Sequence, residues 1–472
     1  MQYVEASMRS MSANGDHMLV LGEYRQTITV VRSLARAGYR ISLGTSQAHG
    51  STAMSRYVSD VHVFEDSHRE RFLDQLESYL QREKPVYVFP VGETEARHIA
   101  HAAGRFMPLA TWVMPDPVTV LRCLDKREIY ELTPTLGIPT APWTKCTDIG
   151  VWPGVAREMG FPVVVKRKDS TTAIKQKKAI ILRSPEAFES FLAELRSDPD
   201  PESLLLQKFA HGERHNCHIA ADGGRVVAFF QQKVLRTDEP DGTGIGIEGA
   251  SVAISGELRN YCERLVKALD YQGIGCIQFM VDQQNGAVAF LEINPRLDST
   301  AALPYRLGYD YPRIATEIAA RKAPAPLTMP YCIGKSYHWL YGDALSWYAS
   351  RKQRRQSPFD LVNWALKMIW RSLTAYHLTW DARDPIPTLH RFTKKFLEFV
   401  FKRATPAHTA VQTGRIENSE VQGQRAIQPR ELPLSPTFDQ ACDASFELKR
   451  CDMIQRRIAA SEQSAARQQF VP

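Results

Sequence analysis

Residues 288–296 place a carboxylate, an amide and a guanidinium directly after a run of apolar residues. The segment reads VAFLEINPR, in which one residue separates Glu292 from Asn294. On a β-strand, residues two apart project from the same face, so both side chains would offer oxygen atoms on one side. Such oxygens suit Mg²⁺, and Pro295 would end the strand because it has no amide hydrogen to donate. The alternative is an ordinary strand end with solvated polar residues, and the segment alone favours neither reading.

Further groups that could do chemistry precede this segment. Asp125 and Lys126 lie in a predicted helix before a Gly-Ile-Pro exit, and Lys166 ends the apolar run FPVVVK on a predicted strand. An ammonium group after such a run is costly to bury unless an anion accompanies it. The predicted strand LLLQKF (204–209) leads to an HGE turn, and GIGCIQF (273–279) leads toward the carboxylate segment.

The elements that must position these residues follow two patterns. In residues 15–118, short apolar strands alternate with helices, which predicts a Rossmann-like parallel α/β sheet. The first turn in that domain lacks GxGxxG, so no dinucleotide is assigned to it. Residues 119–145 predict a helix and a turn. The predicted strands that follow are mixed with helices at PEAFESFLAELRS and at about 256–270, which predicts an α+β domain. Hairpin turns are predicted at 222–224 (DGG) and 285–286 (NG).

The order of these motifs resembles that of the ATP-grasp superfamily, in particular carboxylate–amine ligase-like members and the large-subunit halves of carbamoyl-phosphate synthase. The resemblance covers roughly residues 15–320 and implies a pre-ATP-grasp domain followed by a two-lobed ATP-grasp fold, with a small lobe at about 140–203 and a large lobe at about 204–328. It also implies the use of ATP with two Mg²⁺ ions, or Mn²⁺ in their place. The implied reaction transfers the γ-phosphoryl group to a carboxylate, and an amine then displaces phosphate from the acyl phosphate.

The resemblance places the nucleotide against one helix and several strands. Two lysines would meet the phosphates, and backbone groups of 208 and 209 would pair with the adenine. Glu213 and His215 compete for the ribose contact, because the register of that segment is loose. The implied nucleotide-binding residues are Lys126, Lys166, Gln207, Lys208, Phe209, Glu213 and His215.

The resemblance also implies the metal ligands, which are Gln278, Glu292 and Asn294. Glu292 would bridge two ions, and Asn294 would hold the second. Two ions between the β- and γ-phosphates neutralise the charge that develops during transfer.

Three cations are implied as catalytic residues: Arg296, Lys233 and Arg236. Arg296 would lie beside the γ-phosphate, where a guanidinium can hold a carboxylate or an acyl phosphate with two hydrogen bonds. Lys233 and Arg236 are candidates for the acceptor acid or the γ-phosphate. For both, an ion pair with a nearby acid across the sheet is an equally good interpretation.

One departure from the family pattern lies at 169–178, where relatives carry a glycine-rich loop over the phosphates. Here the loop reads DSTTAIKQKK, with three lysines and no glycine. The hydroxyls of Ser170, Thr171 and Thr172, together with Lys175, could hold phosphate instead. The other interpretation is a chain that binds nucleotide without catalysis and docks to a partner or a membrane surface.

Composition sets the remaining expectations. The chain of 472 residues has room for two to four domains. Its 8 cysteines are scattered without a CxxC pair, and the first residues are polar, which predicts a cytoplasmic protein with reduced thiols. The expected partners are a small-molecule carboxylate and an amine, and no nucleic acid. The oligomeric state stays open, with a homodimer as one option.

The last third of the chain carries the positive charge, with 21 Lys and Arg against 13 Asp and Glu from residue 331 onward. Residues 331–403 predict a basic helical extension. An amphipathic helix within 359–380 is expected to pack on the catalytic core, and contact with an anionic membrane surface is the less favoured alternative. Residues 404–472 are expected to be mostly disordered, with a helix at 447–467.

Overall fold

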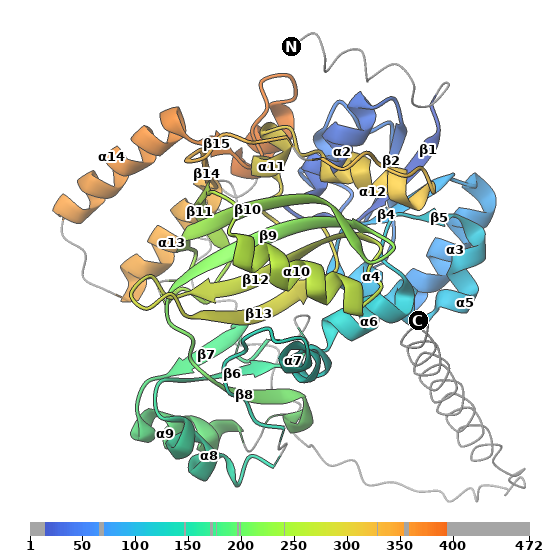
Figure 1. Ribbon diagram of the computed structural model, residues 1–472. Helices are drawn as coiled ribbons and strands as arrows, with labels where there is room; N and C mark the ends of the chain where they lie inside the picture. Colours follow the sequence, from blue (N-terminus) through green and yellow to red (C-terminus); the bar gives the residue numbers. More distant parts are fainter. Residues whose placement is uncertain are drawn as a thin grey trace, which may run out of the picture. The chain divides into compact units, whose positions relative to one another are not determined.

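The computed structural model describes residues 15–393, except for 66–69, 146–147, 170–172, 176, 196–197, 199, 240, 328 and 354–357. These residues belong to one compact unit. They form a five-stranded, a three-stranded and a seven-stranded sheet with helices around them (Figure 1). The predicted tail at 404–472 and its helix at 447–467 lie outside the described residues.

The N-terminal sheet is parallel, in the strand order β3-β2-β1-β4-β5. The alternating side chains of its central strand, β1, enter two different cores: Met18 and Val20 pack with helix α2, and Leu19 and Leu21 pack with helix α3. A parallel sheet covered on both faces explains why this strand is apolar throughout, and the predicted α/β class is confirmed. The elements are β1 (His17–Leu21), α2 (Thr27–Arg36), β2 (Arg40–Thr45), η2 (Thr52–Met54), β3 (Asp60–Val63), α3 (Arg71–Glu83), β4 (Tyr87–Pro90), α4 (Glu93–His101), α5 (Ala103–Phe106), η3 (Met107–Leu109) and β5 (Thr111–Trp112).

The prediction of one helix within 119–145 is wrong, because the chain forms two helices there. These are α6 (Pro117–Leu124) and α7 (Lys126–Thr135). Asp125 between them is extended (φ −92°, ψ 104°), and its carboxylate accepts a hydrogen bond from the Arg127 amide. Aspartate favours this N-cap position over a helix interior. The break makes Lys126 the first residue of α7, at the edge of the cavity described below.

The small lobe is built on a three-stranded antiparallel sheet, in the order β7-β6-β8. Its hydrophobic core contains Trp152, Phe188 and Leu206 and is separate from the other cores. The elements are α8 (Trp152–Met159), β6 (Val163–Arg167), β7 (Ala179–Leu182), α9 (Pro185–Leu195), η4 (Pro201–Ser203) and β8 (Leu204–Lys208).

The large lobe is built on the seven-stranded sheet, in the order β13-β12-β9-β10-β11-β14-β15. Both predicted hairpins are present: Gly223 and Gly224 turn between β9 and β10 with positive φ, and Gly286 does so between β12 and β13. The elements are β9 (Glu213–Asp222), β10 (Arg225–Thr237), β11 (Gly246–Ser251), α10 (Gly256–Ala268), β12 (Gly273–Val281), β13 (Val288–Asn294), α11 (Ala302–Arg306) and α12 (Tyr311–Ala319).

The C-terminal extension is largely helical, as expected, and it also adds two short strands to the large sheet. β14 pairs antiparallel with β11, and β15 pairs parallel with β14. The elements are β14 (Ser336–His338), α13 (Leu340–Gln353), α14 (Pro358–Thr374) and β15 (Tyr376–His377). Beyond β15 the chain returns to the N-terminal domain, where Arg32 Nε lies 2.9 Å from Asp384 Oδ2.

The ion pair between Arg32 and Asp384 is nearly inaccessible to solvent, with exposed side-chain fractions of 5% and 1%. Replacing Asp384 with alanine leaves a buried guanidinium without its partner. The D384A substitution should therefore lower the free energy of unfolding by about 3–5 kcal/mol, measured by urea denaturation. The control is Asp60→Ala, which breaks an exposed pair with Arg40 and should cost about 0–1 kcal/mol. Equal losses in the two variants would contradict this account of how the extension is attached.

Candidate functional site

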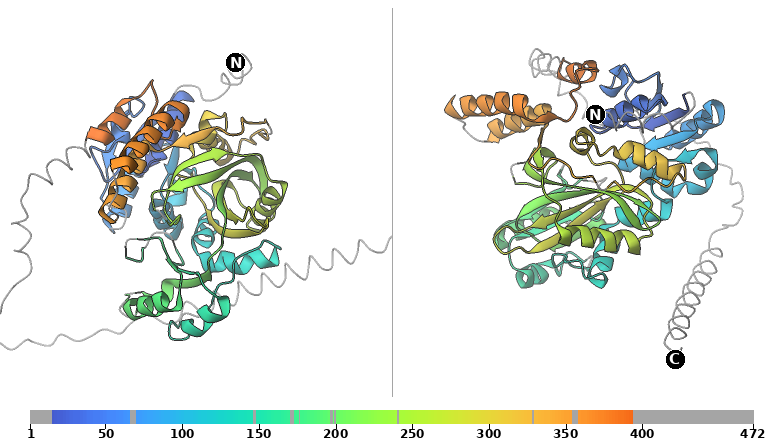
Figure 2. Two further views of the ribbon diagram at one scale, coloured as in Figure 1. Left: turned by 90° about the vertical axis from the view of Figure 1, so that its left-hand side faces the viewer. Right: turned by 45° about the horizontal axis from the view of Figure 1, so that its top comes forward.

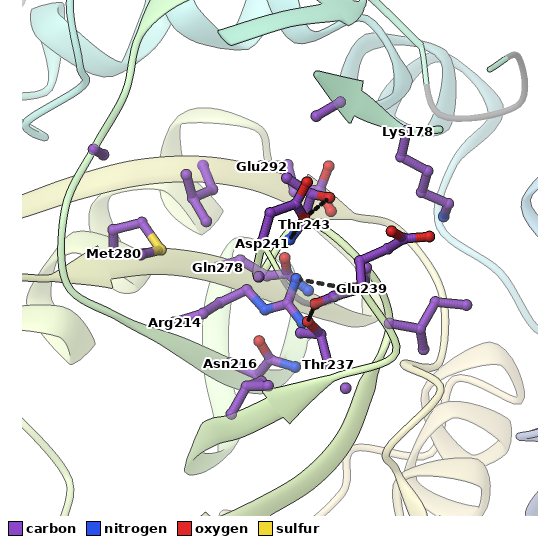
Figure 3. A pocket seen from close by; sticks show the side chains of 18 of the residues that line it. Lys178, Arg214, Asn216, Thr237, Glu239, Asp241, Thr243, Gln278, Met280 and Glu292 are labelled. Carbon is purple, nitrogen blue, oxygen red and sulfur yellow. Dashed lines mark hydrogen bonds between the residues drawn. The ribbon is translucent and has the colours of Figure 1, made fainter. Parts of the chain in front are cut away.

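A cavity of about 720 Å³ lies between the small and large lobes. Its lining comes from the small-lobe sheet, from β9, β10, β12 and β13, and from the loop 238–246 (Figure 3). Among the residues expected from the sequence, the cavity brings together Lys126, Lys166, Gln207, Lys208, Phe209, Glu213, Arg236, Gln278, Glu292, Asn294 and Arg296. His215 and Lys233 are not part of the lining.

A row of polar side chains crosses three neighbouring strands in the cavity. Glu292 on β13 is paired with Gln278 on β12, which is paired with Asn216 on β9. Directly paired residues project from the same face of a sheet, so the three side chains line up on the cavity side. Gln278 and Asn216 are buried. This row offers one carboxylate and two amide groups, a donor set that suits a hard divalent cation.

Asn294, the last residue of β13, and Arg296, two residues after it, continue the site. The Asn294 amide donates to Glu292 Oε1 at 3.1 Å, and Arg296 donates to Asn294 Oδ1 at 3.3 Å. Arg296 Nη2 also lies 3.5 Å from Oε2 of Glu93, the first residue of α4 in the N-terminal domain. Acids around the buried guanidinium, with Glu93 the strongest, keep its pKa above the usual value despite burial. Arg296 therefore stays charged and is held in place by groups from two domains.

Lysines surround Glu292. Lys126 Nζ lies 3.6 Å from Glu292 Oε2, and Lys178 enters the cavity from the edge of the small-lobe sheet (Figure 3). Burial alone would raise the pKa of Glu292, but Lys126 and Lys178, with the Asn294 hydrogen bond and Lys166, lower it to about 2. The carboxylate therefore stays ionised and available to a metal at neutral pH.

Among the described residues, Lys166 has no ion pair with a carboxylate like the pair between Lys126 and Glu292. Its ammonium donates to the Tyr130 hydroxyl at 2.6 Å and lies 5.0 Å from the centre of that ring. Desolvation, together with the nearby charge of Lys126, lowers the pKa of Lys166 to about 7. An anion in the cavity would stabilise the charged form and raise this pKa.

Several polar groups of the segment 207–209 that were expected to contact adenine form hydrogen bonds within the protein. The Gln207 amide donates to the Ala141 carbonyl at 3.1 Å. The backbone amides of Lys208 and Phe209, expected to face adenine, donate instead to the carbonyls of Pro142 and Pro162. They are engaged because β8 continues its pairing to these positions. The next backbone amide, that of Ala210 in the cavity lining, remains a candidate for the expected role.

The remaining predicted cations are paired with acids. Lys233 donates to both carboxylate oxygens of Glu213, at 3.1 and 3.0 Å. Arg236 lines the cavity, but its guanidinium contacts Glu248 at 2.7 Å and Asp343 of α13 at 3.1 and 2.5 Å. For these two residues the structure therefore corresponds to the ion-pair interpretation.

His215 lies on the opposite face of β9 from Asn216, because successive side chains of a strand alternate. Its Nδ1 is 2.9 Å from the Gln231 amide nitrogen. The structure thus places His215 apart from the nucleotide-binding candidates and puts its neighbours Arg214 and Asn216 in the cavity instead.

Several lining residues were not found from the sequence. Alternation along β9 could have identified Arg214 and Asn216, had the register been known. Asp298 follows the metal segment and accepts hydrogen bonds from the Thr300 amide and hydroxyl. Its carboxylate also lies within 4.8 Å of ligand atoms of the buried His218 and Cys276. The other polar lining residues absent from the predictions are Asp169, Lys178, Thr237, Glu239, Asp241, Thr243, Ser299, Thr300 and Ser346.

Comparisons with known families agree with this geometry. Residues 125–323 match the family model described as "Carbamoyl-phosphate synthase L chain, ATP binding domain". A region of 218 residues is 24% identical to the carbamoyl phosphate synthase large chain of Pyrococcus furiosus, covering 44% of this chain and 20% of that protein. A region of 219 residues is 23% identical to pyruvate carboxylase of Komagataella pastoris, covering 44% and 18%. The chain thus spans about a fifth of the length of these relatives.

Solved structures show the same fold. The biotin carboxylase domain of 2-oxoglutarate carboxylase from Hydrogenobacter thermophilus, in complex with MgADP, ADP and bicarbonate, matches with a TM-score of 0.56 at 16% identity, covering 69% of this chain and 74% of that one. N5-carboxyaminoimidazole synthetase from Staphylococcus aureus, complexed with ADP, matches with a TM-score of 0.53 at 11% identity, covering 69% and 81%. The fold is therefore that of ATP-grasp proteins, as the motif order implied.

The low pKa of Lys166 predicts that binding of Mg·ATP takes up a proton. At about pH 8, one unit above that pKa, Lys166 is mostly neutral before binding and becomes charged beside the triphosphate. At about pH 6 it is already charged, so the uptake should largely vanish. Calorimetric titrations in buffers of different ionisation enthalpy measure this proton count.

Two variants separate the effect of Lys166 from other titrating groups. K166M should abolish the uptake at the higher pH, whereas K267M, on the exposed side of α10, should leave it unchanged. Equal uptake by wild type and K166M would show that another group titrates.

Proposed function

We propose that this chain, whose residues 125–323 carry an ATP-grasp domain, is an ADP-forming ligase that activates a carboxylate as an acyl phosphate and joins it to an amine. The observation that carries the proposal is the meeting of lysines and oxygen ligands in one cavity. Lys126, Lys166 and Lys178 supply cations for a triphosphate, and Glu292 lies among them as an ionised metal ligand. The ionised carboxylate beside these lysines supports a bound metal ion at the phosphates.

The row Glu292–Gln278–Asn216 and the adjacent Asn294 fit Mg²⁺ by the chemistry of their donor atoms. Bound there, Mg²⁺ would offset the negative charge of the phosphates during transfer. The chain's own part is to orient these ligands through the pairing of β9, β12 and β13, and to keep Glu292 ionised.

The adenine is proposed to lie against the apolar part of the cavity. Val164 and Ile181 line it from the small lobe, and Met280 and Leu291 line it from the large lobe. The Lys208 carbonyl and the Ala210 amide would then read the edge of the base, since the amides of Lys208 and Phe209 are already engaged.

The acceptor carboxylate is proposed to bind at Arg296, which is charged and fixed by Glu93 and Asn294. A carboxylate oxygen attacks the γ-phosphorus, and the bond from that phosphorus to the β-phosphate oxygen breaks to release ADP. The amine nitrogen then attacks the acyl carbon, phosphate leaves with the electrons of the C–O bond, and the nitrogen gives up a proton. Both steps need positioning and charge compensation more than covalent chemistry from the protein.

The second candidate function is nucleotide binding without turnover, and the glycine-free loop at 169–178 favours it. Residues 170–172 and 176 of this loop, including the three hydroxyl residues considered for phosphate binding, lie outside the described residues. In the described part, Lys178 faces the cavity, so the loop contributes at least one cation to the site.

The test is ADP release by the purified chain with Mg·ATP, against pooled carboxylates and pooled amines. E292A should lower the rate by at least about 100-fold, the loss seen when one group that stabilises developing charge is removed. The matched control is E263A, which removes an exposed carboxylate of α10 that pairs with Arg259, and it should keep the wild-type rate.

Release that requires an acid pool and disappears in E292A would support acyl-phosphate chemistry. Binding of Mg·ATP without release under any pool would favour the nucleotide-binding function. Undiminished release in E292A would refute the metal assignment.

A further inference from the structure

An exposed apolar stripe runs along α14. It consists of Phe359, Val362, Leu366, Ile369, Trp370 and Leu373, whose exposed fractions range from 56% to 79%. At 3.6 residues per turn, these six positions fall within an arc of about 100° on one side of the helix. Contiguous exposed apolar surface of this kind marks interaction sites in soluble proteins.

The opposite side of α14 attaches the helix to the protein. The Trp364 ring stacks on Trp347 of α13, with ring centres 4.7 Å apart. Met368 is buried, and Arg371 pairs with Glu248 of β11 at 2.5 Å. The expected packing on the core is therefore present, and it uses the face that does not carry the α14 stripe. Figure 1 and the right-hand view of Figure 2 show α14 extending away from β14 and β15.

We propose that the α14 stripe docks the protein on an anionic lipid surface. Two observations favour a lipid surface as the binding partner of the stripe. The sequence carries four Lys and Arg at 351–355, directly before α14, and Lys367 is exposed on the helix itself. Arg371 is already paired with Glu248. The sequence next to the stripe is therefore basic, and anionic headgroups attract positive charge. The stripe also carries Trp370 and Phe359, and large aromatic side chains favour the boundary between headgroups and acyl chains.

A second copy of the chain fits the stripe less well. In a two-fold symmetric dimer the same patch meets itself, so two stripes that adjoin the same basic sequence would approach each other, and like charges repel. No helix among the described residues is long and apolar enough to cross a bilayer. The geometry thus points to a helix lying in the plane of the membrane surface.

Docking through the α14 stripe would place the cavity close to the lipid. α13 lies between them: its Trp347 stacks on α14, and its Ser346 lines the cavity. The Ser346 hydroxyl also donates to the carbonyl of Asp238 at 2.8 Å, at the start of the loop that lines the cavity. The proposal stands independently of the proposed ligase function, because it concerns only this surface.

The test is co-sedimentation of the full chain with vesicles of phosphatidylcholine alone or mixed with phosphatidylglycerol. The double variant L366E/W370E places two charges on the stripe, and it should bind anionic vesicles at least about tenfold more weakly than wild type, because charged groups oppose entry into the apolar boundary. The matched control is V118E/V151E, which makes the same kind of change at exposed apolar residues outside α14, and it should bind like wild type. Binding of the wild type should also fall with rising salt and be weak on phosphatidylcholine alone.

Melting temperature and circular dichroism show whether each variant is folded, and this check does not depend on ADP release. Absence of wild-type binding to anionic vesicles, or equal binding by the stripe variant, would overturn the proposal. A dimer detected by light scattering that dissociates in L366E/W370E, without vesicle binding by wild type, would also overturn it and assign the stripe to a second copy.

Discussion

The ionised carboxylate of Glu292 is the interaction on which the cavity depends. Lys126 and Lys178 approach it closely enough to lower its pKa to about 2. Without that negative charge, the lysines would repel one another in a partly desolvated space, and Lys166 already has a pKa of about 7 for this reason. Around Glu292, the three lysines Lys126, Lys166 and Lys178 carry more positive charge than this one carboxylate offsets, which favours the binding of a polyanion beside them.

The site could be predicted from the sequence where one short segment determines the geometry. The period-two spacing of Glu292 and Asn294 and the apolar run before them identified β13, and the Asn-Gly turn linked it to β12. The sequence did not predict which side chains face the cavity where this depends on the register between neighbouring strands. A slip of one residue exchanges the two faces of a strand. The candidates predicted from the sequence include His215 but not its neighbour Asn216, which lies opposite Gln278.

Other features of the structure could not be predicted, because no short stretch of the sequence indicates them. The break at Asp125 divides a stretch that has continuous helical periodicity on both sides. β14 and β15 contain three and two residues, too few for a pattern to appear. The pairing of Arg236 with Asp343 joins residues 107 apart in sequence, and only the folded chain brings them together. The acids that neutralise Arg236 come in part from the extension, which is why the core sequence alone left its role open.

The distribution of hydrophobic cores has a mechanical consequence. Residues from the N-terminal sheet, from β9, β10 and β12, and Leu378 beyond β15 share one core, and Asp384 fastens the extension to Arg32. The small lobe has a core of its own, and β8 divides its side chains, giving Leu206 to that core and Leu205 to the core of the large lobe. Three parts of the chain thus share one core, whereas the small lobe meets them through β8 and through polar contacts such as those of Arg127 with the carbonyls of Glu202 and Leu204. Any closure over a bound ligand should be a rotation of the small lobe alone, with β8 and the segment that follows it as the axis.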